Sequence, residues 1–96
     1  MSSQLQCLRK FAKQIKANHP YLKAVYIAVM PNDPSYDLEV EVSGDTIDGV
    51  FDTGWPTTTK GLANARKDAD TLDRELGKLG IKVYATREEW EEFLHE

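Results

Sequence analysis

The stretch GLANARKDADTLDRELGKLG, residues 61–80, carries apolar side chains at intervals of three or four residues. The apolar positions are Leu62, Ala65, Ala69, Leu72, Leu76 and Leu79. This spacing lays all of them along one stripe of an α-helix. We therefore predict a long amphipathic helix that opens after Trp55 and Pro56, with Thr57 or Thr58 as its N-cap.

A strand pattern precedes this helix at residues 38–42, where LEVEV alternates apolar and acidic side chains. Such alternation is typical of a strand with one face buried and the other in water. The β-branched and aromatic run at residues 24–30 predicts an earlier strand. Gly44 and Asp45 favour a two-residue turn, after which residues 46–52 return as an antiparallel strand.

Two further helices flank this central part of the chain. Residues 5–15 carry apolar side chains at helical spacing, and Pro20 favours an end to this helix shortly before it. Residues 81–84 have the composition of a short strand. Thr86 and Glu89 have the spacing of a capping box, which predicts a last helix from there.

The resulting element order is α-β-β-β-α-β-α. Each of the first two helices offers a single apolar stripe, which is best buried on a sheet. We therefore expect an α+β two-layer sandwich, with a mainly antiparallel sheet and helices one and two on one face. The length of 96 residues suits one small domain over residues 1–96.

The charges are distributed unevenly along the sequence. The net charge is -4, yet residues 1–32 contain basic side chains and no acidic ones. All 16 acidic residues follow from Asp33 onward. This asymmetry predicts two electrostatic faces. A lone cysteine, Cys7, and an N-terminus without a signal-peptide pattern favour a cytoplasmic protein. The longest strongly apolar stretch, residues 23–30, is too short to span a bilayer, so we expect no membrane partner.

The predicted register brings like charges together on the face of the sheet away from the helices. A two-residue turn places Glu41 opposite Asp48 and Asp37 opposite Asp52, at a cost of up to ~1 kcal/mol for each pair. Carboxylates with interleaved aromatic side chains suit contact with a basic protein surface. The candidate partner-binding residues are Asp37, Glu39, Glu41, Asp48, Asp52, Tyr26 and Tyr84.

Two short motifs match the spacing of catalytic or metal-binding signatures. Asp52, Thr53 and Gly54 match the signature of retroviral-type aspartic proteases, but Trp55 follows in place of a small residue. That chemistry also needs an almost all-β scaffold that brings two aspartates together across a dimer. Glu92 and His95 have the spacing of a metal-binding pair, but a bundle site needs two copies. We expect no enzyme activity, no cofactor and no metal.

In size, acidity and lack of a catalytic set, the chain resembles the inhibitor proteins of bacteriophages and mobile elements, anti-CRISPR proteins among them. The resemblance implies a nucleic-acid mimic that presents carboxylates where phosphates normally lie. We therefore expect a small acidic, non-enzymatic protein-binding module that blocks a basic surface of a partner protein.

The order helix, three antiparallel strands, helix also resembles a double-stranded RNA-binding domain, over residues 3–79. Residues 37–42, the turn at Gly44, and Gly54 before the long helix carry this resemblance. The lysine cluster that this family places at the start of the second helix is absent from residues 57–61. The alternative function is therefore nucleic-acid binding, through the candidate residues Arg9, Lys13, Lys16, Lys60, Arg66 and Lys67.

Overall fold

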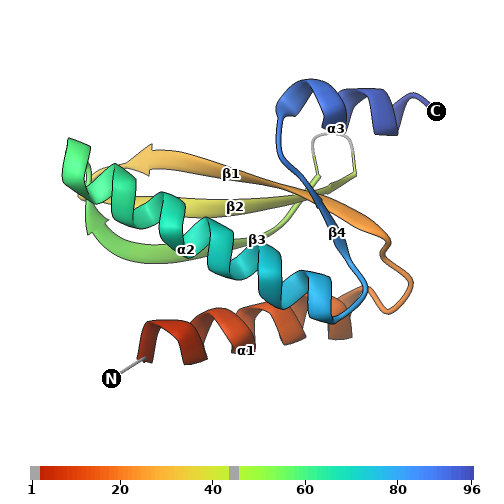
Figure 1. Cartoon of the computed structure of the whole chain (residues 1–96), viewed down its shortest axis with the longest axis horizontal. Helices are drawn as coiled ribbons and strands as arrows, with labels where there is room; N and C mark the ends of the chain where they lie inside the picture. Colours follow the sequence, from red (N-terminus) through yellow and green to blue (C-terminus); the bar gives the residue numbers. More distant parts are fainter. Residues whose placement is uncertain (1–2, 44–45) are drawn as a thin grey trace.

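The computed structural model describes residues 3–43 and 46–96. Its elements are α1 (Ser3–Asn18), β1 (Ala24–Asn32), β2 (Ser35–Ser43), β3 (Thr46–Pro56), α2 (Thr59–Lys78), β4 (Lys82–Tyr84) and α3 (Arg87–Leu94) (Figure 1). The expected α+β class and the order α-β-β-β-α-β-α are confirmed. The predicted turn at Gly44 and Asp45 lies outside the described residues.

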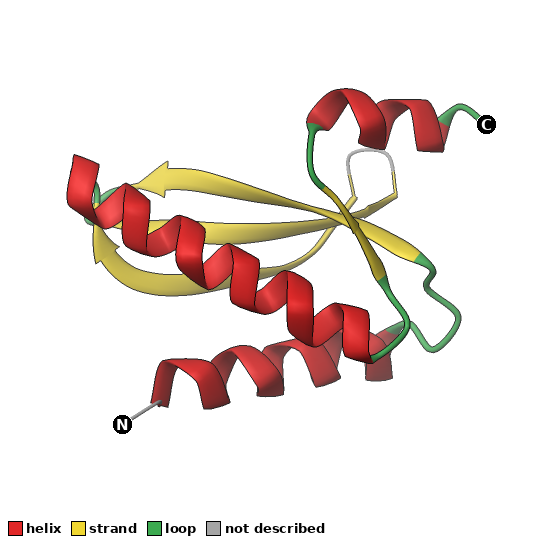
Figure 2. Cartoon of the chain, viewed as in Figure 1, coloured by secondary structure: helices red, strands yellow, loops and turns green. Residues whose placement is uncertain are grey.

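The four strands form one mixed sheet in the order β3-β2-β1-β4. β1 with β2 and β2 with β3 pair antiparallel, whereas β4 pairs parallel with β1 over three residues. Helices α1 and α2 lie beside each other and pack on one face of this sheet (Figure 2). The core between them is made of Leu8, Ala12, Ile15, Val25, Leu38, Val40, Leu72, Leu76 and Ile81.

Local contacts explain where α2 begins and ends. The Thr58 side chain accepts a hydrogen bond from the N–H of Gly61, as expected of the predicted N-cap. Gly61 itself is needed for space, because a Cβ there would lie 1.7 Å from the carbonyl oxygen of Pro56. After the last turn, Gly80 adopts a φ of 82°, which favours glycine. The Thr86 side chain caps α3 in the same way as Thr58 caps α2, by accepting from the N–H of Glu89.

Two details of β3 differ from the sequence-based expectation. The strand continues to Pro56, so Trp55 and Pro56 belong to β3 rather than to the approach to α2. The pair Asp37 with Asp52 is as predicted. The pairing of Glu41 with Asp48 is wrong, since an irregularity next to Val40 puts Ile47 opposite Glu41. Asp48 is the extra residue of a β-bulge.

The third helix lies on the opposite face of the sheet from α1 and α2. Leu38 and Val40 are wholly buried in the core, so their strand neighbours Glu39 and Glu41 point to the other face. We call this second face the outer face. Trp90 of α3 is wholly buried and donates a hydrogen bond to Glu41 there. One end of the outer face is therefore covered, which adds a third layer at that end only.

Candidate functional site

The outer face is built from the four strands of the sheet, whose pairing places its side chains in rows. One row joins Ile47, Glu41 and Tyr26, and continues to Tyr84 on β4. The next row joins Val50, Glu39 and Ala28, and the third joins Asp52, Asp37 and Met30. The central strand β2 thus supplies a carboxylate to every row, with other side chains on both sides.

The first row forms the closed end of the outer face, defined here as Glu41, Tyr26 and Tyr84 with Arg87 and Trp90 of α3. Glu41 is only 7% exposed. Its carboxylate accepts hydrogen bonds from Arg87 Nη1, at 2.7 Å, and from the indole N–H of Trp90. The hydrogen bond with Glu41 is the main reason that the pKa of Arg87 is raised. A carboxylate neutralised in this way is an internal contact of the fold.

Aromatic packing completes the closed end. The Arg87 guanidinium lies 5.0 Å from the centre of the Tyr26 ring. Tyr84 packs on Trp90 and on Phe93, with ring centres 5.8 and 5.2 Å apart. Two of the candidate partner-binding residues, Tyr26 and Tyr84, therefore contact α3 in the folded chain.

The other two rows form the open end, defined here as Asp37, Glu39, Asp52, Met30 and Val50, of which Asp37 is itself only 8% exposed. Val50 is 53% exposed and Met30 is 41% exposed. Glu39 is half-buried, and its side chain has no hydrogen bond or ion pair with any other described residue. The open end thus combines a carboxylate that lacks an internal partner with exposed apolar side chains.

Local hydrogen bonds relieve the repulsion between the facing aspartates of the open end. The side-chain amide of Asn32 donates to Asp37 at 2.8 Å. The hydroxyl of Ser35 and the N–H of Gly54 donate to Asp52 at 2.8 and 2.9 Å. These two bonds, that of Gly54 first, lower the pKa of Asp52.

The expected placement of Asp48 on the outer face is wrong. The β-bulge directs this side chain toward α1, where its carboxylate lies 2.5 Å from Nε2 of His19. Asp48 also lines a small hollow with Phe11 and Asn18 of α1. The predicted Glu41 and Asp48 repulsion is therefore absent, because the two carboxylates point to opposite faces.

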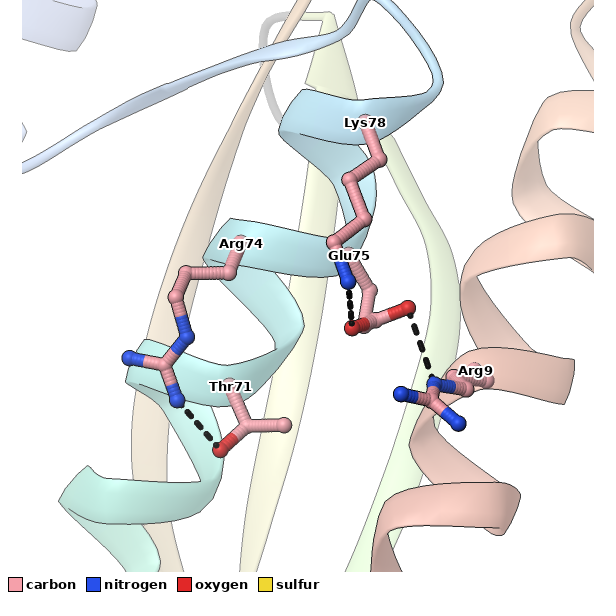
Figure 3. Close-up of polar contacts among 5 residues, drawn as sticks. All are labelled: Arg9, Thr71, Arg74, Glu75 and Lys78. Carbon is pink, nitrogen blue, oxygen red and sulfur yellow. Dashed lines mark hydrogen bonds and ion pairs between the residues drawn. The ribbon is translucent and has the colours of Figure 1, made fainter.

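The candidate nucleic-acid-binding residues lie on the two long helices. Together α1 and α2 carry nine Lys and Arg side chains against four Asp and Glu. Arg9 of α1 is engaged by Glu75 of α2 at 3.3 Å, and Lys78 binds the other oxygen of the same carboxylate at 3.0 Å (Figure 3). Lys16 donates to the carbonyl oxygen of Pro20.

The remaining candidate cations are free of such contacts. The side chains of Lys13, Lys60, Arg66 and Lys67 have no hydrogen bond or ion pair within residues 3–43 and 46–96, and all four residues are exposed. The predicted division into two electrostatic faces thus follows the layers of the fold. A net positive helix layer opposes a sheet and α3 that are net negative.

The described residues do not form a metal centre. Nowhere in residues 3–43 and 46–96 do three or more His, Cys, Asp or Glu side chains gather so as to hold a metal ion. Cys7 is exposed. None of the described helices has the length and apolar character needed to cross a membrane.

The fold and the outer face define a small α+β protein with a partly covered sheet and opposite charges on its two sides. Comparison of the chain with protein-family models, with curated proteins and with solved structures found no match.

Sequence reasoning missed the residues that close one end of the outer face. The expected last helix is present, but its position on the outer face was not foreseen. One sequence signal could have indicated this position. The last helix carries Trp90 and a single basic residue, Arg87, among four glutamates. A large aromatic and a lone cation in such a helix favour contact with an acidic strand.

Proposed function

We propose that this chain is a non-enzymatic protein-binding module that contacts a cationic surface of a partner protein through the open end of its outer face. The observation that carries the proposal is the row Val50, Glu39 and Ala28, where a carboxylate with no polar partner among the described residues lies between two apolar residues. Charge steers a basic partner toward such a row, and the apolar side chains supply buried area. A nucleic-acid-binding surface is the kind of basic partner surface that this row fits.

An inhibitor function agrees with this proposal. A small protein that presents carboxylates to a basic surface competes with the phosphates that the surface normally binds. This is the mode that the likeness to phage and mobile-element inhibitors, anti-CRISPR proteins included, implies. A cytoplasmic location belongs to the same proposal, because enzymes that act on nucleic acid are found there.

The test compares a double variant of the open end with a charge-matched control. Glu39→Gln with Val50→Ser removes the unpaired carboxylate and its exposed apolar neighbour. Glu92→Gln removes one negative charge from the exposed side of α3. We expect a partner captured from the native host to bind the wild type and Glu92→Gln alike, and to bind the double variant at least tenfold more weakly.

The salt dependence completes this test. Capture of the partner is expected to weaken as salt rises, because electrostatic steering is screened. Equal capture by the wild type and the double variant contradicts the proposal. A partner that Glu92→Gln also fails to capture places the contact on α3 instead.

A second candidate function is nucleic-acid binding by the helix layer. The observation in its favour is the excess of basic side chains on α1 and α2, with Lys13 and Lys67 both exposed and unpaired among the described residues. Binding to random-sequence double-stranded RNA, measured at two salt concentrations, tests it. Lys13→Glu with Lys67→Glu is expected to abolish such binding and to leave partner capture by the open end unchanged.

A further inference from the structure

The sheet has an edge that its own strands leave incomplete. β1 runs over nine residues, Ala24–Asn32, but β4 pairs only with its first three. After Tyr84 the chain leaves the sheet, and Thr86 caps α3. Figure 2 shows β1 continuing well past the point where β4 crosses it. Among the described residues, no strand pairs with this side of residues 27–32.

The parallel ladder shows which backbone groups this edge presents. The N–H of Lys82 donates to the carbonyl of Lys23 at 2.9 Å. Backbone groups of successive strand residues point to opposite sides, so those of residues 25, 27 and 29 also point toward β4. Val29 lies beyond β4 and therefore directs both its N–H and its C=O to the open edge. Pro31 has no N–H, which limits the usable edge to a short segment.

A groove runs beside this edge, between β1 and α2. It has a volume of about 340 Å³, and its apolar lining includes Ile27 and Val29 of β1 and Ala69 of α2. All three side chains are only partly buried. The small side chain of Ala69 leaves room for aliphatic groups that project from a strand added next to β1. Open edge groups beside an apolar groove are the two requirements for β-strand addition.

The charges of the groove specify its occupant further. Asp70 and Asp73 lie on its α2 wall, three residues apart, and Arg66 is its one basic lining residue within the described chain. Burial and the nearby Asp70 carboxylate, in that order, raise the pKa of Asp73. With two carboxylates and one cation in its described lining, the groove is net negative, and a basic side chain of an occupant would lie next to these carboxylates.

We propose that the open edge of β1 and its groove bind an extended peptide of a partner protein by β-strand addition. The peptide carries aliphatic side chains at alternate positions that enter the groove, and a lysine or arginine on the same side that meets Asp70 and Asp73. This peptide site is separate from the open end of the outer face and does not depend on the function proposed there.

The first test is selection from a random heptapeptide library on the immobilised full chain. We expect enriched peptides with two aliphatic residues and one basic residue at alternating positions. Synthetic copies are expected to bind at least tenfold more weakly to Ala69→Phe, which fills the groove. The double variant Asp70→Asn with Asp73→Asn, which keeps the wall's shape, is expected to weaken binding several-fold. Glu39→Gln with Val50→Ser serves as the control and is expected to bind normally.

Three outcomes of this selection overturn the proposal. The first is that no peptide is enriched over the blank surface. The second is that enriched peptides bind the groove variants as well as they bind the wild type. The third is that the control of the outer face loses binding, which would move the peptide to the site of the proposed function.

The second test measures amide hydrogen exchange along β1. The amide hydrogen of Val29 is expected to exchange at least tenfold more slowly in the presence of a saturating selected peptide. The amide of Ala28 points to β2 and is expected to exchange at an unchanged rate. An unchanged rate at Val29 rules out strand addition. Protection of Val29 that rises with protein concentration alone would mean that a second copy of this chain occupies the edge, which also overturns the peptide proposal.

Discussion

Glu41 and Glu39 lie two residues apart on the same strand and point to the same face, yet their surroundings differ completely. Glu41 is buried under α3, where Arg87 and Trp90 satisfy its carboxylate. Glu39 has no such partner among the described residues, and exposed Val50 lies opposite it. The alternation of residues 38–42 predicted equally well that both side chains lie on the outer face. The difference between them comes from the helix that covers one and leaves the other.

This difference separates structural acidic residues from those available to a partner. At the closed end, the fold itself supplies the cation and the hydrogen-bond donor that a binding partner would otherwise supply. At the open end, the aspartates use nearby polar groups, but the Glu39 carboxylate has no hydrogen bond or ion pair with another described residue, and Val50 is more than half exposed. Variants at the two ends are therefore expected to affect different properties: stability at the closed end and association at the open end.

The largest expected effect is that of Trp90→Ala. This substitution removes a wholly buried indole and leaves a cavity, with a loss of about 3–5 kcal/mol in the free energy of unfolding. Urea unfolding followed by circular dichroism measures it. A loss below about 1 kcal/mol would show that α3 does not cover the outer face in solution, and the distinction between the two ends would fail.

The next effect concerns Glu41 and Asp48, whose predicted repulsion the structure does not contain. Repulsion would make Glu41→Gln with Asp48→Asn neutral or stabilising. Because the two carboxylates bind Arg87 and His19 instead, we expect this double variant to lose about 1–3 kcal/mol in the free energy of unfolding. Thermal and urea unfolding test this, with Glu92→Gln as a control for the loss of charge. A gain in stability would instead support the predicted pairing of Glu41 with Asp48.

Local patterns in the sequence predicted the elements that local physics determines. The stripe from Leu62 to Leu79 and the alternation at residues 38–42 each specify an element without reference to the rest of the fold. The caps at Thr58 and Thr86 are also local, since each satisfies an N–H three residues further on. The element order and the helix-covered face followed from these signals.

What the sequence did not predict depends on contacts between distant residues. The bulge at Asp48 accompanies a contact with His19, which lies 29 residues away in the sequence. The position of α3 rests on Glu41 and Arg87, which are 46 residues apart. The incomplete edge of β1 arises because β4 ends after three residues and the chain then turns onto the outer face. The bulge, the position of α3 and the incomplete edge of β1 correspond to no periodic pattern in the sequence.

A smaller effect is expected at Asp52, whose carboxylate is exposed and satisfied without α3. Its pKa in the folded protein is below the ordinary value of 3.8, chiefly because of the Gly54 N–H and then the Ser35 hydroxyl. A lowered pKa stabilises the fold above the pKa of the unfolded chain, and this contribution is lost as pH falls through the folded-state pKa.

The variant Asp52→Asn is therefore expected to be less stable than the wild type at pH 7, with a gap that closes as the pH falls below about 4. Urea unfolding of both proteins between pH 7 and pH 2.5 measures the gap. Ser35→Ala is expected to narrow the same gap, because it removes one of the two donors. A gap that stays constant with pH would mean that the charge of Asp52 does not contribute.

The smallest expected effect is that of Glu39→Gln with Val50→Ser on stability, and it is the sharpest test of the comparison. Neither side chain makes a hydrogen bond or an ion pair with another described residue, and Val50 is more than half exposed. Val50 lies at the surface, and the half-buried Glu39 has no internal polar partner to lose, so we expect the free energy of unfolding to change by no more than about 0.5 kcal/mol. The same variant is expected to weaken partner association at least tenfold. If it instead lost more than about 1 kcal/mol of stability, Glu39 and Val50 would be packed in solution. The open end would then resemble the closed end, and the weaker association would have to be attributed to unfolding.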